Sequence, residues 1–198
     1  GCTLSHILHT EGTMPKIYTK RGDEGQTKLL FGDGVSKSDP RTEAYGSTDS
    51  AVSAMGLARA LCQDVRVKEV LLRVQREMFT VGAELATDPA NREMLQTHFS
   101  ETTAEMVTAL EEDIDEMLPQ MKLPRAFIVP GASAGSGALD LARSMLRTGE
   151  RRVVALHEDG KLPNPEVLRY LNRLSDLLFV LARFEDRALP IELTTGEA

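Results

Sequence analysis

Residues 163–183 read PNPEVLRYLNRLSDLLFVLAR, and this stretch decides the fold class. Its apolar side chains recur at intervals of four, three, four and three positions, at Val167, Leu171, Leu174, Leu178 and Leu181. Such intervals place side chains on one face of an α-helix. The stretch therefore predicts a helix from Pro163 to Arg183 whose apolar stripe packs against other helices.

Four segments that precede this stretch also predict helices. Residues 64–86 carry an apolar stripe that steps by three or four positions, at Val67, Val70, Val74, Met78, Val81 and Leu85. Residues 41–63 are rich in Ala, a strong helix former. Residues 100–119 repeat the apolar spacing, residues 138–156 complete the set, and DPANRE at 88–93 predicts a break. The sequence therefore predicts an all-α fold, a five-helix bundle with short connections.

The length and the ends of the chain predict one domain. The chain has 198 residues, and one domain usually has roughly 100–200. We expect residues 14–190 to form that domain. Residues 1–13 are interpreted as a leader or expression remnant without fixed structure, and residues 191–198 as a flexible C-terminal tail.

Composition excludes several classes of function. The net charge of −7 and the 5% of aromatic residues, with no Trp, argue against nucleic-acid binding, which depends on basic patches and stacking aromatics. The apolar runs are shorter than the roughly 18 residues needed to span a bilayer, so no membrane association is expected. Two cysteines form neither a disulfide framework nor a zinc site. We therefore expect a cytoplasmic protein.

The first candidate site is the loop TKRGDEGQTK at residues 19–28. Glycines allow backbone N–H groups to turn inward, and Thr hydroxyls and Lys ammonium groups add donors, which together can cradle a phosphate. The loop lacks the Walker spacing of Gly, Lys and Ser or Thr. A solvated turn is therefore the alternative interpretation.

Two further candidates lie on predicted helices. Arg143, Arg147, Glu150 and Arg151 share one helix face, and the planar fork of Arg suits bidentate phosphate binding. A surface paired through Glu150 is the alternative. Asn172 and Asp176 lie one turn apart beside the Leu stripe of residues 163–183, where ordinary flanking residues are the alternative.

Five motifs in a fixed order carry a family resemblance. They are YTKRGDEGQT at 18–27, KSDPRTEAYGSTD at 37–49, FIVPG at 127–131, LARSMLRTGERRVVAL at 141–156 and YLNRLSDLLFVLAR at 170–183. From Lys16 to about Arg183 the chain resembles the PduO-type ATP:cob(I)alamin adenosyltransferases. The resemblance implies transfer of the 5′-deoxyadenosyl group of ATP to Co(I) of a corrinoid, with Mg²⁺ on the phosphates. It also implies a homotrimer with sites between subunits, and a reductase and an adenosylcobalamin-dependent enzyme as transient partners.

The resemblance also assigns roles to individual residues. It implies ATP contacts from the N-terminal segment, the fourth predicted helix and the fifth, at Thr19, Lys20, Arg21, Gly22, Thr27, Lys28, Lys37, Arg147, Thr148, Gly149, Glu150, Arg151 and Asn172. Arg143 stands at a position important for activity. Asp49 matches an aspartate that pairs with an arginine across the subunit interface, which we expect to be Arg147. Phe127 matches an aromatic residue that crowds the lower face of the corrin ring, and a core aromatic is the alternative.

The chain departs from the family pattern close to these positions. Ser50-Ala51-Val52 replaces Glu-Leu-Asn, Thr148 replaces Arg, Asp140 replaces His, and Pro130-Gly131-Ala132 replaces Pro-Gly-Gly. The lost acidic and amide groups favour a second hypothesis, a non-catalytic protein that binds ATP or corrinoid and delivers or senses the cofactor. A ferritin-like metal bundle is excluded, because the sequence contains no Glu-x-x-His pair.

Overall fold

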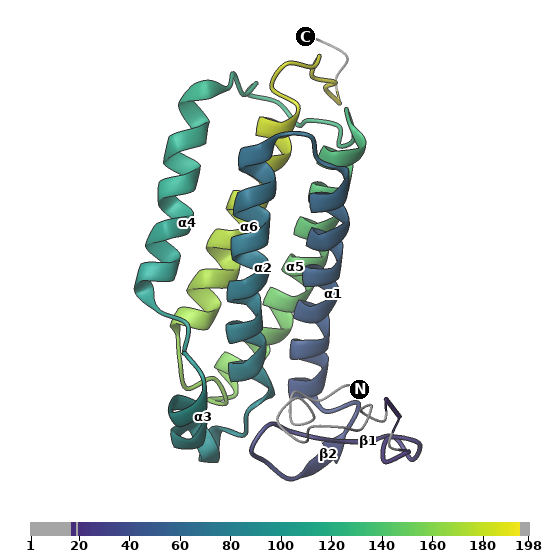
Figure 1. Cartoon of the computed structure of the whole chain (residues 1–198), viewed down its shortest axis with the longest axis vertical. Coiled ribbons are helices and arrows are strands. Elements are labelled where there is room, and N and C mark those ends of the chain that lie inside the picture. Colours follow the sequence, from purple (N-terminus) through teal and green to yellow (C-terminus); the bar gives the residue numbers. More distant parts are fainter. Residues whose placement is uncertain (1–16, 19, 195–198) are drawn as a thin grey trace, which may run out of the picture.

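The computed structural model describes residues 17, 18 and 20–194, and long helices dominate it (Figure 1). Five helices run along the long axis of the molecule: α1 (Pro40–Leu61), α2 (Val65–Ala86), α4 (Ala104–Met117), α5 (Ala134–Glu158) and α6 (Glu166–Glu185). Shorter elements lie at the two ends: strands β1 (Gln26–Lys28) and β2 (Gly34–Ser36), helix α3 (Arg92–His98), and the 3₁₀ turns η2 (Pro89–Asn91) and η3 (Leu118–Gln120).

The expected count of five helices is corrected by α3, so that the described residues contain six α-helices. This seven-residue helix begins at Arg92, within the predicted break at 88–93, and Leu95, only 2% exposed, anchors it. The next helix begins at Ala104 rather than at Ser100, because the Thr103 side chain accepts the N–H of Met106 and caps it there. The residues before Thr103 are held elsewhere: Thr102 donates its N–H to Glu84, and Glu101 pairs with Arg92.

Capping residues also set the starts of α2 and α5. Asp64 caps α2 by accepting the N–H of Val67, so this start agrees with the predicted segment 64–86. Ser133 and Ser136 form a reciprocal capping box at the start of α5, and the helix therefore begins four residues before the predicted Ala138. The helix predicted from Pro163 begins at Glu166, after Pro165.

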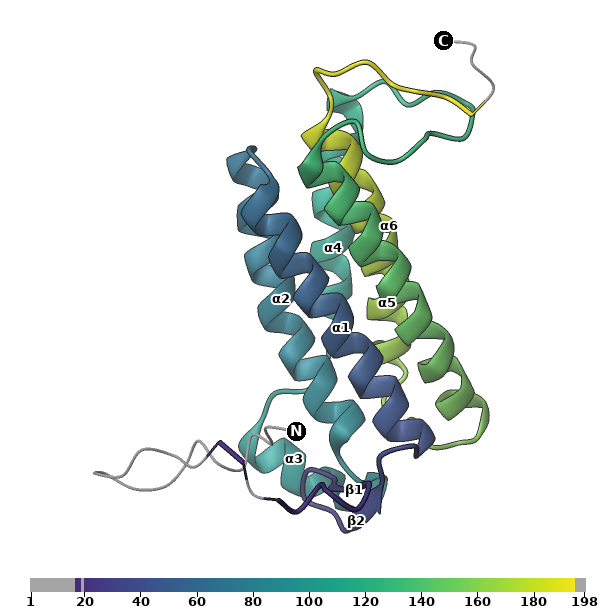
Figure 2. The ribbon, with the colours of Figure 1, turned by 90° about the vertical axis from the view of Figure 1, so that its right-hand side faces the viewer.

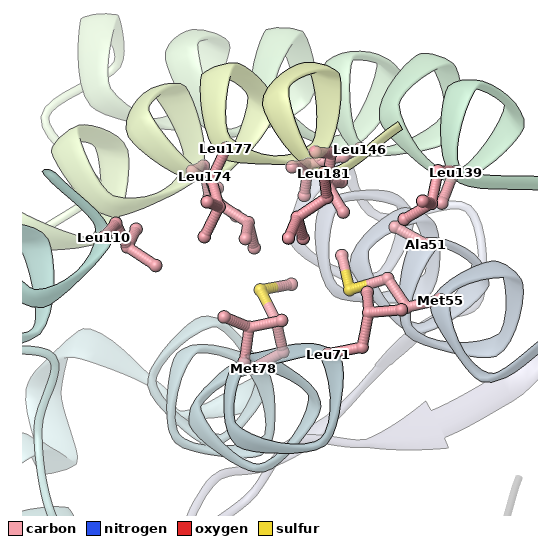
Figure 3. Packing of buried hydrophobic residues seen from close by; sticks show 14 of the residues in the cluster. Ala51, Met55, Leu71, Met78, Leu110, Leu139, Leu146, Leu174, Leu177 and Leu181 are labelled. Atoms are coloured by element: carbon pink, nitrogen blue, oxygen red, sulfur yellow. The ribbon is translucent and has the colours of Figure 1, made fainter. Parts of the chain in front are cut away.

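The apolar core lies between α1, α2, α5 and α6, with α4 against its outer side (Figure 3). Met55 of α1 and Leu71 of α2 face Leu181 of α6 across this core (Figure 3). The predicted stripe of residues 163–183 is confirmed, since all five of its members are fully buried: Val167, Leu171, Leu174, Leu178 and Leu181.

Helices α1 and α5 pack closely along their length in opposite directions (Figure 2). A Cβ added at Gly149 would lie 3.3 Å from Thr48 Cγ2, and one added at Gly135 would lie 2.9 Å from Cys62 Cα. These two glycines therefore permit the close approach. As a result, residues around Gly149 on α5 lie at the same level of the bundle as residues around Thr48 on α1.

The β1–β2 hairpin lies at the end of the bundle where α1 begins (Figure 1). The N–H of Leu30 donates to Ala86 O at 2.8 Å, and the Phe31 ring stacks on His98 at 5.6 Å. Buried Arg41 donates to Leu85 O at 3.0 Å and also to Lys161 O. Burial lowers the pKa of the Arg41 guanidinium, while Asp88 and Asp39 oppose that effect. The hairpin is thereby fixed to α2 and α3.

None of the helices in the described part of the chain is long and apolar enough to cross a membrane. The predicted leader, residues 1–13, and residues 195–198 of the predicted tail lie outside the described residues. Residues 192–194 fall within the predicted tail and pair with the segment before α5: Val129 N donates to Glu192 O at 2.8 Å and Thr194 N to Phe127 O at 3.1 Å.

Candidate functional site

The N-terminal loop, residues 20–37, folds back on itself through Lys37. The Lys37 ammonium donates to Gly22 O at 2.9 Å, and the Lys37 N–H donates to Gly25 O at 2.9 Å. A Cβ at Gly22 would lie 2.9 Å from Lys37 Nζ, so a side chain there would displace the end of Lys37. An ammonium group has three donors. Lys37 can therefore close the loop and still donate to an anion.

The other predicted loop residues are placed around this closure. Lys20 adopts a positive φ of 61°, which a non-glycine residue rarely adopts. Lys20, Arg21 and Lys28 are exposed, and Thr27 is half-buried in β1. Thr19 lies outside the described residues. The loop therefore presents a group of cations around a fixed turn of backbone.

Helix α5 presents a second cationic surface, which we call the α5 face: Arg147, Thr148 and Arg151. Arg147 and Arg151 are exposed, and Thr148 is half-buried between them. The Arg151 guanidinium donates to Thr148 Oγ1 at 3.1 Å, and that hydroxyl donates to Ser144 O at 3.2 Å. Thr148, which replaces the usual Arg, thus holds Arg151 against the helix.

Three predicted ATP-contacting residues beside the α5 face, Gly149, Glu150 and Asn172, have different surroundings. Gly149 is buried against Thr48 of α1, so it acts on the α5 face through helix packing. Glu150 is half-buried, and Asn172 is exposed on α6. Asp176, one turn after Asn172, accepts from Arg173 at 3.1 Å.

Asp49 follows Thr48 on α1 and lies exposed at the level of the α5 face. Neither Asp49 nor Arg147 belongs to any ion pair among residues 17, 18 and 20–194. Both charges are thus exposed on the subunit, where Asp49 can pair with a cation of a second chain and Arg147 can bind an anion or a carboxylate of a second chain.

Sequence reasoning did not predict two arginines that organise this region. Arg152 donates to Glu43 O at 3.1 Å, contacts the Glu43 carboxylate at 2.9 Å and also donates to Ser47, so it ties α5 to α1. Arg183 forms a buried ion pair with Asp140, one turn before Arg143. The spacing of Asp140 and Arg143 was visible in the sequence. The partner Arg183, 43 positions beyond Asp140, could not be found from local pattern.

Phe127 lies far from the loop within one subunit. Its segment connects η3 to α5 at the end of the bundle opposite the hairpin (Figures 1 and 2). The side chain is 84% exposed, so the core alternative is wrong. Arg147 of the α5 face is also distant, because it lies 13 residues after Ala134, where the Phe127 segment joins α5, and this is roughly 20 Å along the helix. The structure therefore does not bring the loop and Phe127 together in one chain.

Beside the Phe127 segment is a cavity of about 410 Å³. Its walls include Ile128, Val129 and Ile191, and Arg183 and Arg187 line it as well. Both arginines are already engaged: Arg183 pairs with Asp140, and Arg187 pairs with Asp64 at 2.8 Å. The charges of these two arginines are thus already paired within the subunit, and neither is left to bind a ligand in the cavity.

Comparison with known proteins gives one consistent result. A sequence profile of the cobalamin adenosyltransferase family matches residues 17–185. The chain is 37% identical over 173 residues to a corrinoid adenosyltransferase of Citrobacter freundii, covering 87% of this chain and 96% of that protein. It is 38% identical over 170 residues to the corrinoid adenosyltransferase PduO of Salmonella typhimurium, covering 86% of this chain and 49% of that longer protein.

Among solved structures, a single-residue variant of the PduO-type ATP:corrinoid adenosyltransferase from Lactobacillus reuteri has a TM-score of 0.83. It is 33% identical in sequence, and the match covers 92% of this chain and 98% of that chain. That structure is complexed with cobalamin and ATP. Sequence profile, relatives and fold thus agree, and the chain belongs to the cobalamin adenosyltransferase family.

Proposed function

We propose that this protein transfers the 5′-deoxyadenosyl group of ATP to the Co(I) centre of a reduced corrinoid, forming adenosylcobalamin and releasing triphosphate. Family membership supports the reaction, since the relatives are corrinoid adenosyltransferases. The observation that carries the proposal is the α5 face, where Arg147 is exposed and Arg151 is held in place by Thr148. Exposed, oriented guanidiniums are suited to bind a triphosphate.

The reaction needs no side-chain nucleophile. Co(I) supplies the electron pair that forms the Co–C5′ bond, the C5′–O5′ bond breaks, and its electron pair leaves with triphosphate, so cobalt becomes formally Co(III). The protein then has to orient ATP and stabilise the charge that grows on the leaving oxygen. We assign this stabilisation to Arg147, Arg151 and Lys20, and the cradling of the phosphates to the loop closed by Lys37.

Mg²⁺ fits this arrangement as an ion held mainly by the substrate. In nucleotide sites Mg²⁺ binds phosphate oxygens together with one or two protein oxygens and water. Glu150, the residue after Gly149 on α5, offers a half-buried carboxylate as such an oxygen. Bound there, Mg²⁺ would neutralise charge on the triphosphate.

We infer that the complete site forms between subunits of a homotrimer. The hairpin is anchored to α2 and α3, whereas α5 packs on α1 and α6. Asp49 and Arg147 are both exposed and carry no ion pair within the described subunit, which supports a pair between chains. Phe127 projects from the opposite end of its own chain, where it can crowd the lower face of a corrin bound at a neighbour's ATP site.

The proposed reaction also implies transient partners. A reductase must supply the Co(I) corrinoid, because the cobalt enters the reaction two electrons more reduced than it leaves. The adenosylated product serves an adenosylcobalamin-dependent enzyme. An apolar wedge such as Phe127 would assist the reductase, because removal of the lower axial ligand makes cob(II)alamin easier to reduce.

A second candidate function is a binding protein that delivers or senses the cofactor without turnover. It is favoured by Ser50-Ala51-Val52, which lacks the usual acidic and amide groups beside Asp49. A spectrophotometric assay with chemically reduced cobalamin and ATP separates the two functions. The enzyme converts the Co(I) spectrum to that of adenosylcobalamin at a rate proportional to protein. Saturable ATP binding without any such conversion would establish the binding protein instead.

A further inference from the structure

Four side chains on α5 and α6, which we call the Arg143 cluster, form a charged group that lies one to two turns before the α5 face along α5: Asp140, Arg143, Phe179 and Arg183. Asp140 is 6% exposed, and its Oδ2 accepts from Arg183 in a buried ion pair. Its Oδ1 lies 3.8 Å from Arg143 Nε. The Phe179 ring lies 5.4 Å from Arg183 Cζ and 6.0 Å from Arg143 Cζ. Two guanidiniums thus share one carboxylate and one ring.

The charges in the Arg143 cluster do not cancel. Two guanidiniums and one carboxylate leave one positive charge. The burial of the two arginines shows which of them carries the unpaired charge. Arg183 is only 7% exposed and pairs directly with the carboxylate, whereas the Arg143 side chain is 32% exposed. The surplus charge therefore belongs to Arg143, at the surface one turn before Arg147.

The orientation of Arg143 follows from its single buried nitrogen. Arg143 Nε is buried and has no hydrogen-bond partner within residues 17, 18 and 20–194. At 3.8 Å from Asp140 Oδ1 it is held by charge rather than by a formed hydrogen bond. Because the Nε side is buried, the exposed part of the side chain is its terminal fork. The fork is thus free to bind an anion.

We propose that Asp140 is a positioning residue that orients Arg143 for adenosyl transfer. Arg183 takes one oxygen of Asp140 and so prevents the carboxylate from closing on the fork of Arg143. Asp140 then fixes the Nε side while the fork keeps its charge and its donors for the reacting complex. Phe179 supports both guanidiniums by cation–π contact. This inference rests on the proposed function, and it gives a role to the carboxylate that stands where the family pattern has His.

The test compares two buried carboxylates with the same chemistry in different places. Asp113 on α4 is buried like Asp140 and pairs with two arginines, Arg66 at 2.8 Å and Arg73. It lies on the outer side of the bundle, against α2 and away from α5. Asp113→Asn is therefore the matched control for Asp140→Asn. Removing either carboxylate charge breaks a buried pair and lowers the melting temperature.

Only Asp140→Asn should change catalysis. We expect a loss of kcat of tenfold or more, measured well below the melting temperature, with the KM for ATP changed less than kcat. Asp113→Asn should keep kcat within twofold. On an Arg143→Ala background, Asp140→Asn should add less than a twofold loss, because the residue that it positions is absent. If Asp140→Asn does not fold, Asp140→Glu replaces it in the same cycle, because it keeps the charge but moves the carboxylate relative to Arg143 Nε, and the same loss of kcat is expected.

Two results would overturn the proposal. Equal kcat in Asp140→Asn and Asp113→Asn at matched stability reduces Asp140 to a structural residue. If the double variant shows a loss of kcat equal to the product of the losses in Asp140→Asn and Arg143→Ala, the two residues act independently. A wild-type protein that binds ATP but makes no adenosylcobalamin would be a different result, since it overturns the proposed function and this inference with it.

Discussion

At the scale of single residues, neighbouring cations on α5 have different roles. Arg147 is exposed and makes no ion pair within the described subunit, whereas Arg152 joins the Glu43 carboxylate and Ser47 of α1. We expect Arg147→Ala to abolish nearly all turnover, because a charge-assisted contact in a desolvated site contributes about 2–5 kcal/mol. The melting temperature of Arg147→Ala should change little, because Arg147 makes no ion pair within the described subunit. Steady-state turnover and thermal unfolding measure the two effects.

Arg152→Ala is the matched control for Arg147→Ala. It removes a partly exposed ion pair, which contributes about 0–1 kcal/mol to stability, and it leaves the α5 face in place. Turnover within a few-fold of wild type is expected. If Arg147→Ala retained as much turnover as Arg152→Ala, the α5 face would not be the triphosphate site.

Phe127 allows a separate prediction because its side chain is 84% exposed. Phe127→Ala should leave the melting temperature and the ATP affinity nearly unchanged, since little apolar surface is buried in the subunit. Adenosylation of cobalamin, which must release its tethered lower base, should fall more than that of cobinamide, which has none. The measurement is the ratio of the two rates after in situ reduction of the cob(II) forms. An equal loss for both corrinoids would contradict the wedge.

At the scale of secondary-structure elements, the sequence predicts long helices well and short or capped segments poorly. The stripes of α2 and α6 cover several turns, so their spacing is unmistakable. Helix α3 has seven residues, too few to show a period. The start of α5 depends on Ser133 and Ser136, whose capping box is a local hydrogen-bond pattern rather than a hydrophobic one.

The candidate site likewise has parts that the sequence predicts and parts that it does not. Arg147 and Arg151 could be placed on one helix face because four positions make slightly more than one turn. The closure of the loop could not be predicted, since it depends on Lys37 reaching Gly22 across 15 positions. The buried pair of Asp140 with Arg183 joins two helices, and only their packing brings it together.

The close packing of α1 on α5 gives a prediction at this scale. A Cβ at Gly135 would lie 2.9 Å from Cys62 Cα and 3.2 Å from Cys62 N, so backbone must move. We expect Gly135→Ala to lower the free energy of unfolding by about 1–3 kcal/mol, as overpacking does. Gly137→Ala is the control on the same helical turn, where the nearest atom, Gly131 Cα, is 3.5 Å away.

The control should be neutral or slightly stabilising, because Ala is favoured over Gly in a helix by about 0.5–1 kcal/mol. Denaturant unfolding of both variants measures the difference. Equal stability of the two variants would show that α1 and α5 can separate at no cost, and that the α5 face is not fixed relative to Asp49.

At the scale of the whole molecule, the parts of the proposed site are distributed rather than gathered. The loop is anchored to α2 and α3 at one end, the Phe127 segment lies at the other, and the α5 face lies between them on the side of α1 (Figures 1 and 2). One chain therefore does not bring these groups together, which supports the proposal that the site forms between subunits. In the proposed ring of three chains, each interface joins different surfaces of two neighbours.

This arrangement predicts complementation between inactive subunits. Lys20→Ala removes a cation from the loop, and Arg147→Ala removes one from the α5 face, so each protein alone should be nearly inactive. When the two are unfolded and refolded together in equal amounts, about one quarter of the interfaces should join an intact loop to an intact α5 face. The mixture should then recover about that fraction of wild-type turnover. If loop and α5 face of a site came from one chain, no mixed interface would be intact and turnover would stay at background. Sedimentation of the mixture as trimers is the necessary control, since it shows that the subunits have assembled.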